Sequence, residues 1–251
     1  SKDLFQSAIE GAADLQEAQQ QLQASTGATA KETAAYSAEM QKLYEGGYGD
    51  AVSDVANAMS LVKQYTNETD PSKIRELAEN AITLEDTFNM DLSESIRAAD
   101  TLIDEMGVSS DQAFDLMARG AQKGLNKSGE LADNITEYAS LWAQAGFSAE
   151  EMFTIMENGL DSGSYNLDKV NDYVKEFGNS LADGRIDDNI NAFSDSTKEL
   201  VAQWHDGGAT TKQVFDSVIS DLANMENQQQ ALTIASNTWS ALGEDNSMKV
   251  I

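Results

Sequence analysis

Residues 107–117 read GVSSDQAFDLM, and residues 146–156 read GFSAEEMFTIM. The second copy follows the first at an offset of 39 residues. The correspondence continues downstream, where Leu131, Ile135 and Tyr138 fall opposite Val170, Val174 and Phe177. Apolar residues at i and i+3, such as the Phe and Met of each copy, share one helix face. The pattern therefore predicts a helical unit of about 39 residues that occurs twice in succession.

The first residues of each copy have the sequence pattern of a helix corner, where one helix ends and the next begins. Gly107 suits the left-handed position just past a helix end, and Ser109 with Gln112 forms the sequence pattern of a capping box. The same pattern occurs at Ser148 with Glu151, at Thr29 with Glu32, and at Thr210 with Gln213. The alternative interpretation of these glycines is a loop that binds phosphate. No Gly-x-Gly-x-x-Gly or Gly-Lys-[Ser/Thr] follows a strand pattern here, so helix corners are favoured.

Composition points to an all-α protein. The chain has 251 residues, 41% of them apolar, and Pro71 is its single proline, so long helices are not interrupted. Alternating Val/Ile/Thr runs typical of strands are missing. No cysteine is present, which excludes disulfides, zinc–thiolate sites and thiol catalysis. Neither a signal peptide nor a long apolar run is found, so no membrane contact by this segment is expected.

The charge is strongly negative. With 16 basic and 43 acidic residues the net charge is −27. Such a chain repels nucleic-acid phosphates and anionic membranes at long range, so direct nucleic-acid binding is not expected. Solvated helix faces explain the same charge without any function, and both interpretations stay open.

Apolar periodicity and caps predict ten to twelve helices arranged as successive hairpins with a period of about 39 residues. A compact bundle and a short solenoid-like stack fit equally well. Residues 1–26 are expected to form an N-terminal helix leading in from an upstream region, and residues 27–251 one all-helical domain, with two sub-bundles meeting near 184–195 as an option. The expected helices cover residues 3–25, 29–45, 50–66, 71–88, 91–106, 110–123, 129–145, 149–160, 167–181, 195–206, 211–226 and 229–242.

No residue pattern indicates catalysis or metal binding. The one histidine, His205, has no second His or Cys to work with, and a surface position at a helix end is favoured over a His–Asp pair. Residues 179–190 resemble a calcium loop only in part, because Leu181 and Ile190 stand where carboxylates are needed. Residues 161–172 lack the sixth-position glycine.

Paired carboxylates and tryptophans also have structural explanations. Glu150 with Glu151, and Asp187 with Asp188, sit at expected helix starts, where acidic groups suit the helix dipole. The three tryptophans lie in apolar helical settings and are expected to be core anchors: Trp142, Trp204 and Trp239. We therefore assign no catalytic, cofactor-binding or metal-binding residue and expect no cofactor; residues that bind partners remain unknown.

Several segments together resemble the phage tail tape-measure protein family. The similarity is carried by residues 113–131 (AFDLMARGAQKGLNKSGEL), 95–99 (SIRAA), 137–138 (EY), 166–170 (NLDKV), 175–177 (KEF), 183–184 (DG), 207–215 (GGATTKQVF) and 239–245 (WSALGED). It extends over roughly residues 10–250 and includes no catalytic motif. The chain is thus similar to the conserved globular segment of tape measures from phages or prophages, especially those of Gram-positive hosts.

The resemblance implies a virion structural protein. Tape-measure proteins are mostly helical, lie inside the tail tube, set its length and leave ahead of the DNA. It implies location in the virion tail, and in the host cytoplasm during assembly. The implied partners are other tail proteins (tail tube, tail chaperone, distal tail or tip proteins), with self-association in the tail as an option. A peptidoglycan-degrading, lysozyme-like tail domain and a generic helical adaptor are the alternatives; we expect that the chain is not an enzyme.

Overall fold

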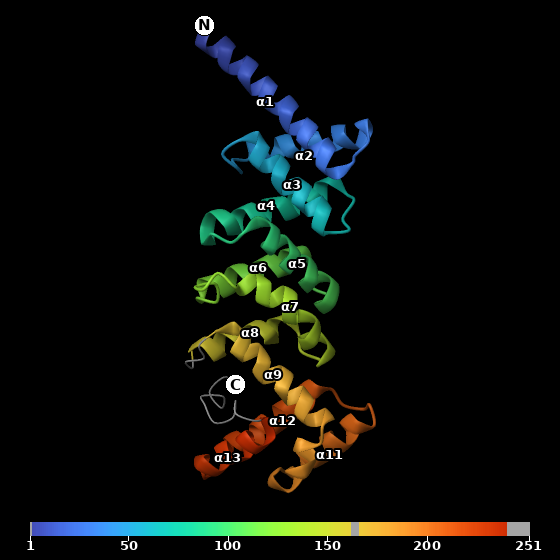
Figure 1. The fold of residues 1–251 in the computed structure, drawn as a ribbon, viewed down its shortest axis with the longest axis vertical. Helices are drawn as coiled ribbons and strands as arrows, with labels where there is room; N and C mark the ends of the chain where they lie inside the picture. Colours follow the sequence, from blue (N-terminus) through green and yellow to red (C-terminus); the bar gives the residue numbers. More distant parts are fainter. Residues whose placement is uncertain (1, 162–165, 240–251) are drawn as a thin grey trace. The chain divides into compact units, whose positions relative to one another are not determined.

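The computed structural model describes residues 2–161 and 166–239, and of residues 2–10, 12 and 239 it describes the backbone alone. The described part consists of helices and connecting loops and contains no strand (Figure 1). The helices are α1 (Lys2–Thr26), α2 (Ala30–Glu45), α3 (Val52–Tyr65), α4 (Pro71–Phe88), α5 (Leu92–Met106), α6 (Ser110–Gln122), α7 (Leu131–Gln144), α8 (Ala149–Asp161), α9 (Leu167–Ala182), α10 (Arg185–Asp188), α11 (Asp195–His205), α12 (Thr211–Ala223) and α13 (Gln228–Trp239), with a 3-10 turn over Ile190–Ala192.

The all-α prediction is confirmed, and each expected helix is present within the described ranges. The described residues hold thirteen α-helices, which is one more than the upper expectation. The additional one is α10, a four-residue helix in the polar segment after Gly184. Sequence periodicity cannot reveal so short a helix, because it completes barely one turn.

The chain divides into two compact units. Unit 1 comprises residues 1–103 and 109–114, and unit 2 comprises residues 104–108 and 115–251. Helix α6 begins in unit 1 and ends in unit 2. Residues 184–195 lie within unit 2. The boundaries 1–26 and 27–251 stay predictions.

Unit 1 is built on α3, which contacts α1, α2 and α4, while α2 also contacts α4. The shared core consists of residues such as Leu22, Met40, Met59 and Ile74, each almost fully buried. Burial of these large side chains is the main stabilising contribution to the unit.

Unit 2 is built on α9, which contacts α7, α8, α10, α12 and α13. Phe215 on α12 is fully buried and meets Phe147 and Phe177 edge-on, with ring centroids 5.5 and 5.1 Å away. Trp142 at the end of α7 packs edge-on against Phe147 at 5.0 Å. Edge-to-face geometry stabilises such pairs beyond the burial of their area.

All four predicted capping boxes are formed. In each, the hydroxyl of the capping residue accepts the N–H of the residue three positions later, and that residue's side chain accepts the N–H of the cap; the pairs are Thr29 with Glu32, Ser109 with Gln112, Ser148 with Glu151, and Thr210 with Gln213. Gly27, Gly107 and Gly146 have positive φ, as a helix end requires. At the fourth corner the left-handed residue is Gly207 (φ 79°), three positions before the cap Thr210, and not Gly208, which the two-position spacing of the other three corners predicts.

The two 39-residue copies bury the same pair of apolar side chains. Phe114, Met117, Phe153 and Met156 are all buried, as predicted. Glycines 120 and 159 hold matching positions in α6 and α8, and neither leaves space for a methyl group. An added Cβ at Gly120 would lie 3.1 Å from a ring carbon of Phe153, and one at Gly159 would lie 2.5 Å from a methyl of Val170. The two glycines thus meet different neighbours, and a repeat of packing stays a prediction.

Candidate functional site

The described residues form no metal cluster: no three His, Cys, Asp or Glu side chains within them are placed to hold an ion. The absence of catalytic and cofactor residues stays a prediction. What the structure does show is a set of polar contacts that join neighbouring helices within each unit. These contacts and the surface around them are the candidates for function.

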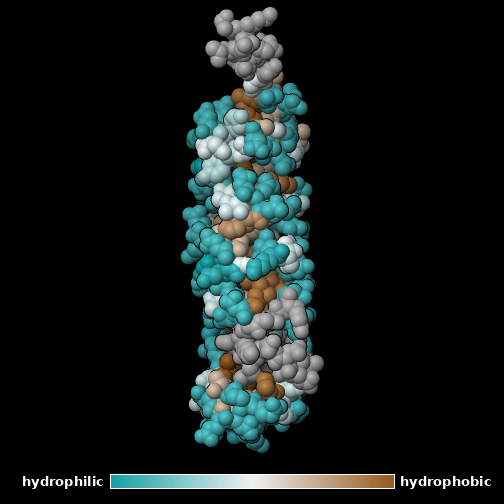
Figure 2. Space-filling model, turned by 90° about the vertical axis from the view of Figure 1, so that its left-hand side faces the viewer, coloured by the Kyte–Doolittle hydropathy of each residue, from teal (hydrophilic) through white to brown (hydrophobic). Residues whose placement is uncertain are grey.

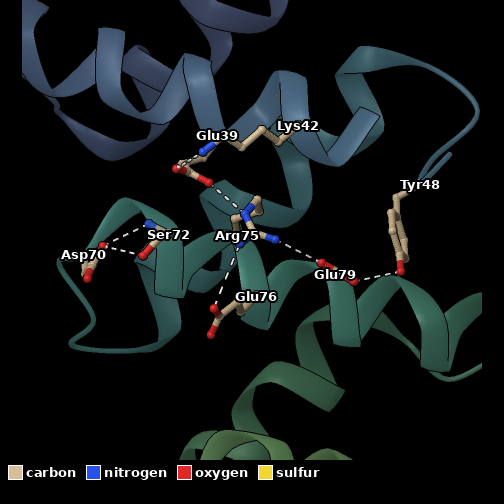
Figure 3. A network of polar contacts seen from close by, with 8 residues as sticks. All are labelled: Glu39, Lys42, Tyr48, Asp70, Ser72, Arg75, Glu76 and Glu79. Carbon is tan, nitrogen blue, oxygen red and sulfur yellow. Dashed lines mark hydrogen bonds and ion pairs between the residues drawn. The ribbon is translucent and has the colours of Figure 1, made fainter. Parts of the chain in front are cut away.

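The most connected of these contacts centres on Arg75 of α4 in unit 1 (Figure 3). Its Nε donates to Glu39 of α2 at 2.7 Å, and its Nη1 donates to Glu79 one helical turn away at 3.1 Å. Glu79 also accepts the hydroxyl of Tyr48 at 2.8 Å. Arg75 thus ties α2, α4 and the loop before α3 into one network. Glu76 lies 3.9 Å from the same guanidinium but is mostly exposed.

Acid–base properties follow from this geometry. Burial alone would raise the pKa of Glu39, but hydrogen bonds from Arg75 and then Lys42 bring that pKa below its ordinary value. The hydrogen bond to Glu79 raises the pKa of Tyr48, and burial adds to the effect. Both groups therefore keep their usual charge at neutral pH. Glu39 can thus hold its ion pair with Arg75 across α2 and α4 at that pH.

Unit 2 contains similar cross-links. Arg119 of α6 reaches Glu157 of α8 at 3.4 Å and also contacts Glu150 on the same helix. Lys212 of α12 contacts Glu151 of α8 at 2.9 Å. Because Glu151 is also the capping-box residue of α8, its carboxylate serves both the helix start and the contact between helices.

A chain of buried amides joins α7 to α9. The indole N–H of Trp142 donates to Asn171 at 2.7 Å, and Asn171 donates to Asn134 at 3.0 Å and to the carbonyl of Leu167 at 2.8 Å. Asn134 in turn donates to the carbonyl of Glu130 at 2.9 Å. Every donor in the chain is satisfied, which a polar group away from water requires.

The predicted surface position of His205 at a helix end is confirmed, but the His–Asp pair that the sequence disfavoured is also present, with Asp187 as the partner. The histidine lies exposed in the last turn of α11, as expected. Its Nε2 lies 2.9 Å from Asp187 of α10, and its ring stacks edge-on with Trp204. Trp142 is fully buried, as predicted for a core anchor. Trp204 is only half-buried, because its indole N–H reaches outward to Thr211 at 3.0 Å. The side chain of Trp239 lies outside the described residues.

Sequence reasoning missed the partners of these charged groups. Arg119 and Glu157 are 38 residues apart and Arg75 and Glu39 are 36 apart. Both separations are close to the 39-residue period. Opposite charges at nearly one repeat length were therefore a usable signal, because consecutive hairpins that stack bring such positions together.

Comparison with known proteins identifies the family. Residues 47–237 match the model of the family "Phage-related minor tail protein", which is more than half of the chain. The chain belongs to the family of phage-related minor tail proteins. No curated protein and no solved structure matches it. This minor tail protein is thus a component of phage tails and interacts with other tail components.

The surface of this minor tail protein is polar. Figure 2 shows a face on which hydrophilic residues predominate and hydrophobic ones are visible only in separate areas. Among the described residues, Tyr44 is the one large hydrophobic side chain that is exposed. No helix in the described ranges combines the length and the apolar character that a membrane span needs.

Proposed function

We propose that this chain is the folded structural and assembly domain of a tail tape-measure protein. In this proposal the full-length protein determines tail length and takes part in DNA ejection, while this segment supports tail assembly through contacts with tube, chaperone, distal tail or tip proteins. The observation that carries the proposal is the resemblance to tape measures along most of the chain, which falls largely inside the region matching the minor tail protein family.

We further propose that this segment is not the ruler itself. A ruler needs a length that grows in proportion to residue number, as a continuous helix does at ~1.5 Å per residue. Here the longest described helix is α1, with 25 residues, and the other helices are shorter. Capping boxes and left-handed glycines end them at short intervals, and ion pairs such as Arg75–Glu39 hold neighbouring helices together. These features support a segment that stays folded.

The test is an in-frame deletion of residues 27–245 in the full-length parent protein, with tail length measured by electron microscopy. Drawn out as one helix, the deleted segment would span about 330 Å. We expect failed assembly, or tails of nearly unchanged length that form in lower yield or do not infect. Tails shortened by the full helical rise of the deleted residues would contradict the folded-domain proposal. Complete, infectious tails of normal length would contradict a role in assembly.

We also propose that the chain is not an enzyme. A zymogram with host cell wall tests this separately, since it reports peptidoglycan cleavage without requiring tails. A cleared band that persists in purified full chain would replace the structural proposal with a lysozyme-like one.

A further inference from the structure

A pocket in unit 2 combines positive charge with apolar side chains. It has a volume of about 240 Å³ and lies where the loop after α6 meets the end of α8 and the start of α9. Its lining consists of Lys123, Gly124, Leu125, Lys127, Ser128, Leu160, Asp161, Asn166 and Leu167. Residues 162–165 fall outside the described part. We call this the lysine pocket.

The two lysines of the pocket form no ion pair within the described part of the chain. Lys123 and Lys127 are both exposed. Other basic groups of unit 2, such as Arg119, Arg185 and Lys212, are paired with carboxylates. Two neighbouring free ammonium groups create a local positive potential on a negative molecule.

The loop that carries the lysines has a fixed conformation. Gly124 and Gly129 have φ of 89° and 77°, which other residues rarely adopt. The Leu125 N–H donates to the carbonyl of Gly120 at 2.9 Å, and the Asn126 side chain accepts the Leu131 N–H at 3.3 Å. The loop is thereby tied to both flanking helices.

Glycine at 124 also determines where Lys127 lies. A Cβ added at Gly124 would be 2.9 Å from Cε of Lys127 and 3.5 Å from its Nζ. The end of the Lys127 side chain therefore lies close to the bare backbone of Gly124, and both residues line the pocket. A lysine side chain that already lies against the backbone loses less conformational entropy on binding an anion than a freely moving one does.

The rest of the lining selects the kind of anion. Leu125 and Leu167 are buried and Leu160 is half-buried, so part of the pocket wall is apolar. The pocket also faces the first residues of α9, the positive end of that helix dipole. Asp161 is the single carboxylate among the described lining residues, so it offsets only part of the positive charge.

We propose that the lysine pocket binds an acidic peptide segment of another protein, with a carboxylate between Lys123 and Lys127 and a neighbouring apolar side chain against the leucines. This inference deepens the proposed function, because the segment would belong to another tail component. A free inorganic anion would use the ammonium groups but not the apolar wall. Nucleic acid is disfavoured by the net charge of −27 around the pocket.

The test uses the full chain and a fluorescently labelled short peptide in which Asp or Glu alternates with Leu, measured by fluorescence polarisation. We expect the double variant Lys123→Gln/Lys127→Gln to weaken binding by about tenfold or more. The matched control is Lys31→Gln/Lys175→Gln, which removes the same charge from two exposed lysines outside the pocket. Its affinity for the peptide should equal that of the unmodified chain.

Three results in the peptide assay would overturn the inference: no measurable binding, equal weakening in both double variants, or displacement of the labelled peptide by inorganic phosphate as efficiently as by unlabelled peptide. The last would identify a free-anion site. Binding of labelled duplex DNA that depends on Lys123 and Lys127 would also overturn it. These outcomes are independent of tail length in the deletion experiment, so failure of the pocket and failure of the tape-measure proposal can be told apart.

Discussion

Replacing Gly159 by alanine tests how tightly α8 and α9 approach each other. A Cβ at this position would lie 2.5 Å from one methyl of Val170, 3.1 Å from the other and 3.4 Å from its Cβ. Ordinary carbon–carbon contacts are about 3.5–4.0 Å. Rotation of Val170 gives little relief, because both methyl groups and their parent carbon face the glycine. The helices themselves would have to move apart.

The magnitude follows from two opposing terms. Extra carbon in a close-packed core costs about 1–3 kcal/mol. Alanine in place of a helical glycine recovers about 0.5–1 kcal/mol, because the unfolded chain loses freedom. Gly159→Ala should therefore destabilise the protein by about 1–2 kcal/mol. The sign is informative, because helix propensity alone predicts the opposite.

Gly178→Ala is the matched control. Gly178 lies within α9, and the nearest side-chain atom to an added Cβ is a Thr211 methyl at 4.0 Å, which is ordinary contact. This variant should gain about 0.5–1 kcal/mol. Urea unfolding of both variants, followed by the helical circular dichroism signal, should shift the midpoint in opposite directions. If Gly159→Ala stabilised the chain as much as Gly178→Ala does, the close approach of α8 and α9 would be refuted.

Three further predictions address the ion network, the repeat core and the charge. Glu39→Gln should lower the free energy of unfolding by about 1–2 kcal/mol at neutral pH, whereas Glu76→Gln, at the exposed 3.9 Å contact to the same arginine, should change it by less than about 0.5 kcal/mol. The pKa of Glu39 is lowered in the fold, so its contribution to the free energy of unfolding is fully present above its ordinary pKa of 4.5. That contribution is lost as the pH falls through the folded pKa. Urea titrations of Glu39→Gln and of the unmodified chain should therefore converge in acid. Phe153→Ala should cost about 3–5 kcal/mol in the same assay, and a loss below about 1 kcal/mol would show that the repeat is not a packing repeat. The chain should not bind duplex DNA at physiological salt, and micromolar affinity with a steep salt dependence in a filter-binding assay would contradict this.

Much of the fold could be predicted because its signals are local. A capping box spans four residues, and a left-handed glycine is a single residue. Ser148 with Glu151 therefore predicts the start of α8 without any tertiary information. Helix faces follow from apolar spacing in the same way. The fourth corner shows the limit of such signals: the spacing to Thr210 points to Gly208, but the adjacent Gly207 has the positive φ.

The contacts between helices could not be predicted from local signals. Asp187 as the partner of His205, and Glu157 as the partner of Arg119, depend on how successive helices stack. The lysine pocket escaped notice for the same reason. Its lysines sit in one loop, but the apolar wall comes partly from Leu160 and Leu167, which only the folded chain brings beside them.

The buried amide chain between α7 and α9 bears on how a repeated sequence avoids pairing with itself wrongly. Two similar 39-residue copies offer interchangeable apolar faces, and exchange of like elements is a characteristic error of repeat proteins. The Trp142–Asn171 bond is not repeated: the residue 39 positions after Trp142 is Leu181, and the residue 39 positions before Asn171 is Ala132.

A mispaired helix would therefore bury an indole N–H or a carboxamide without its partner, at a cost of about 1–3 kcal/mol for each group. Apolar matching alone imposes no comparable penalty. Only the correct neighbouring helix satisfies the hydrogen bonds of Trp142, Asn171 and Asn134. A chain made of near-copies thus keeps a unique order of assembly along its length.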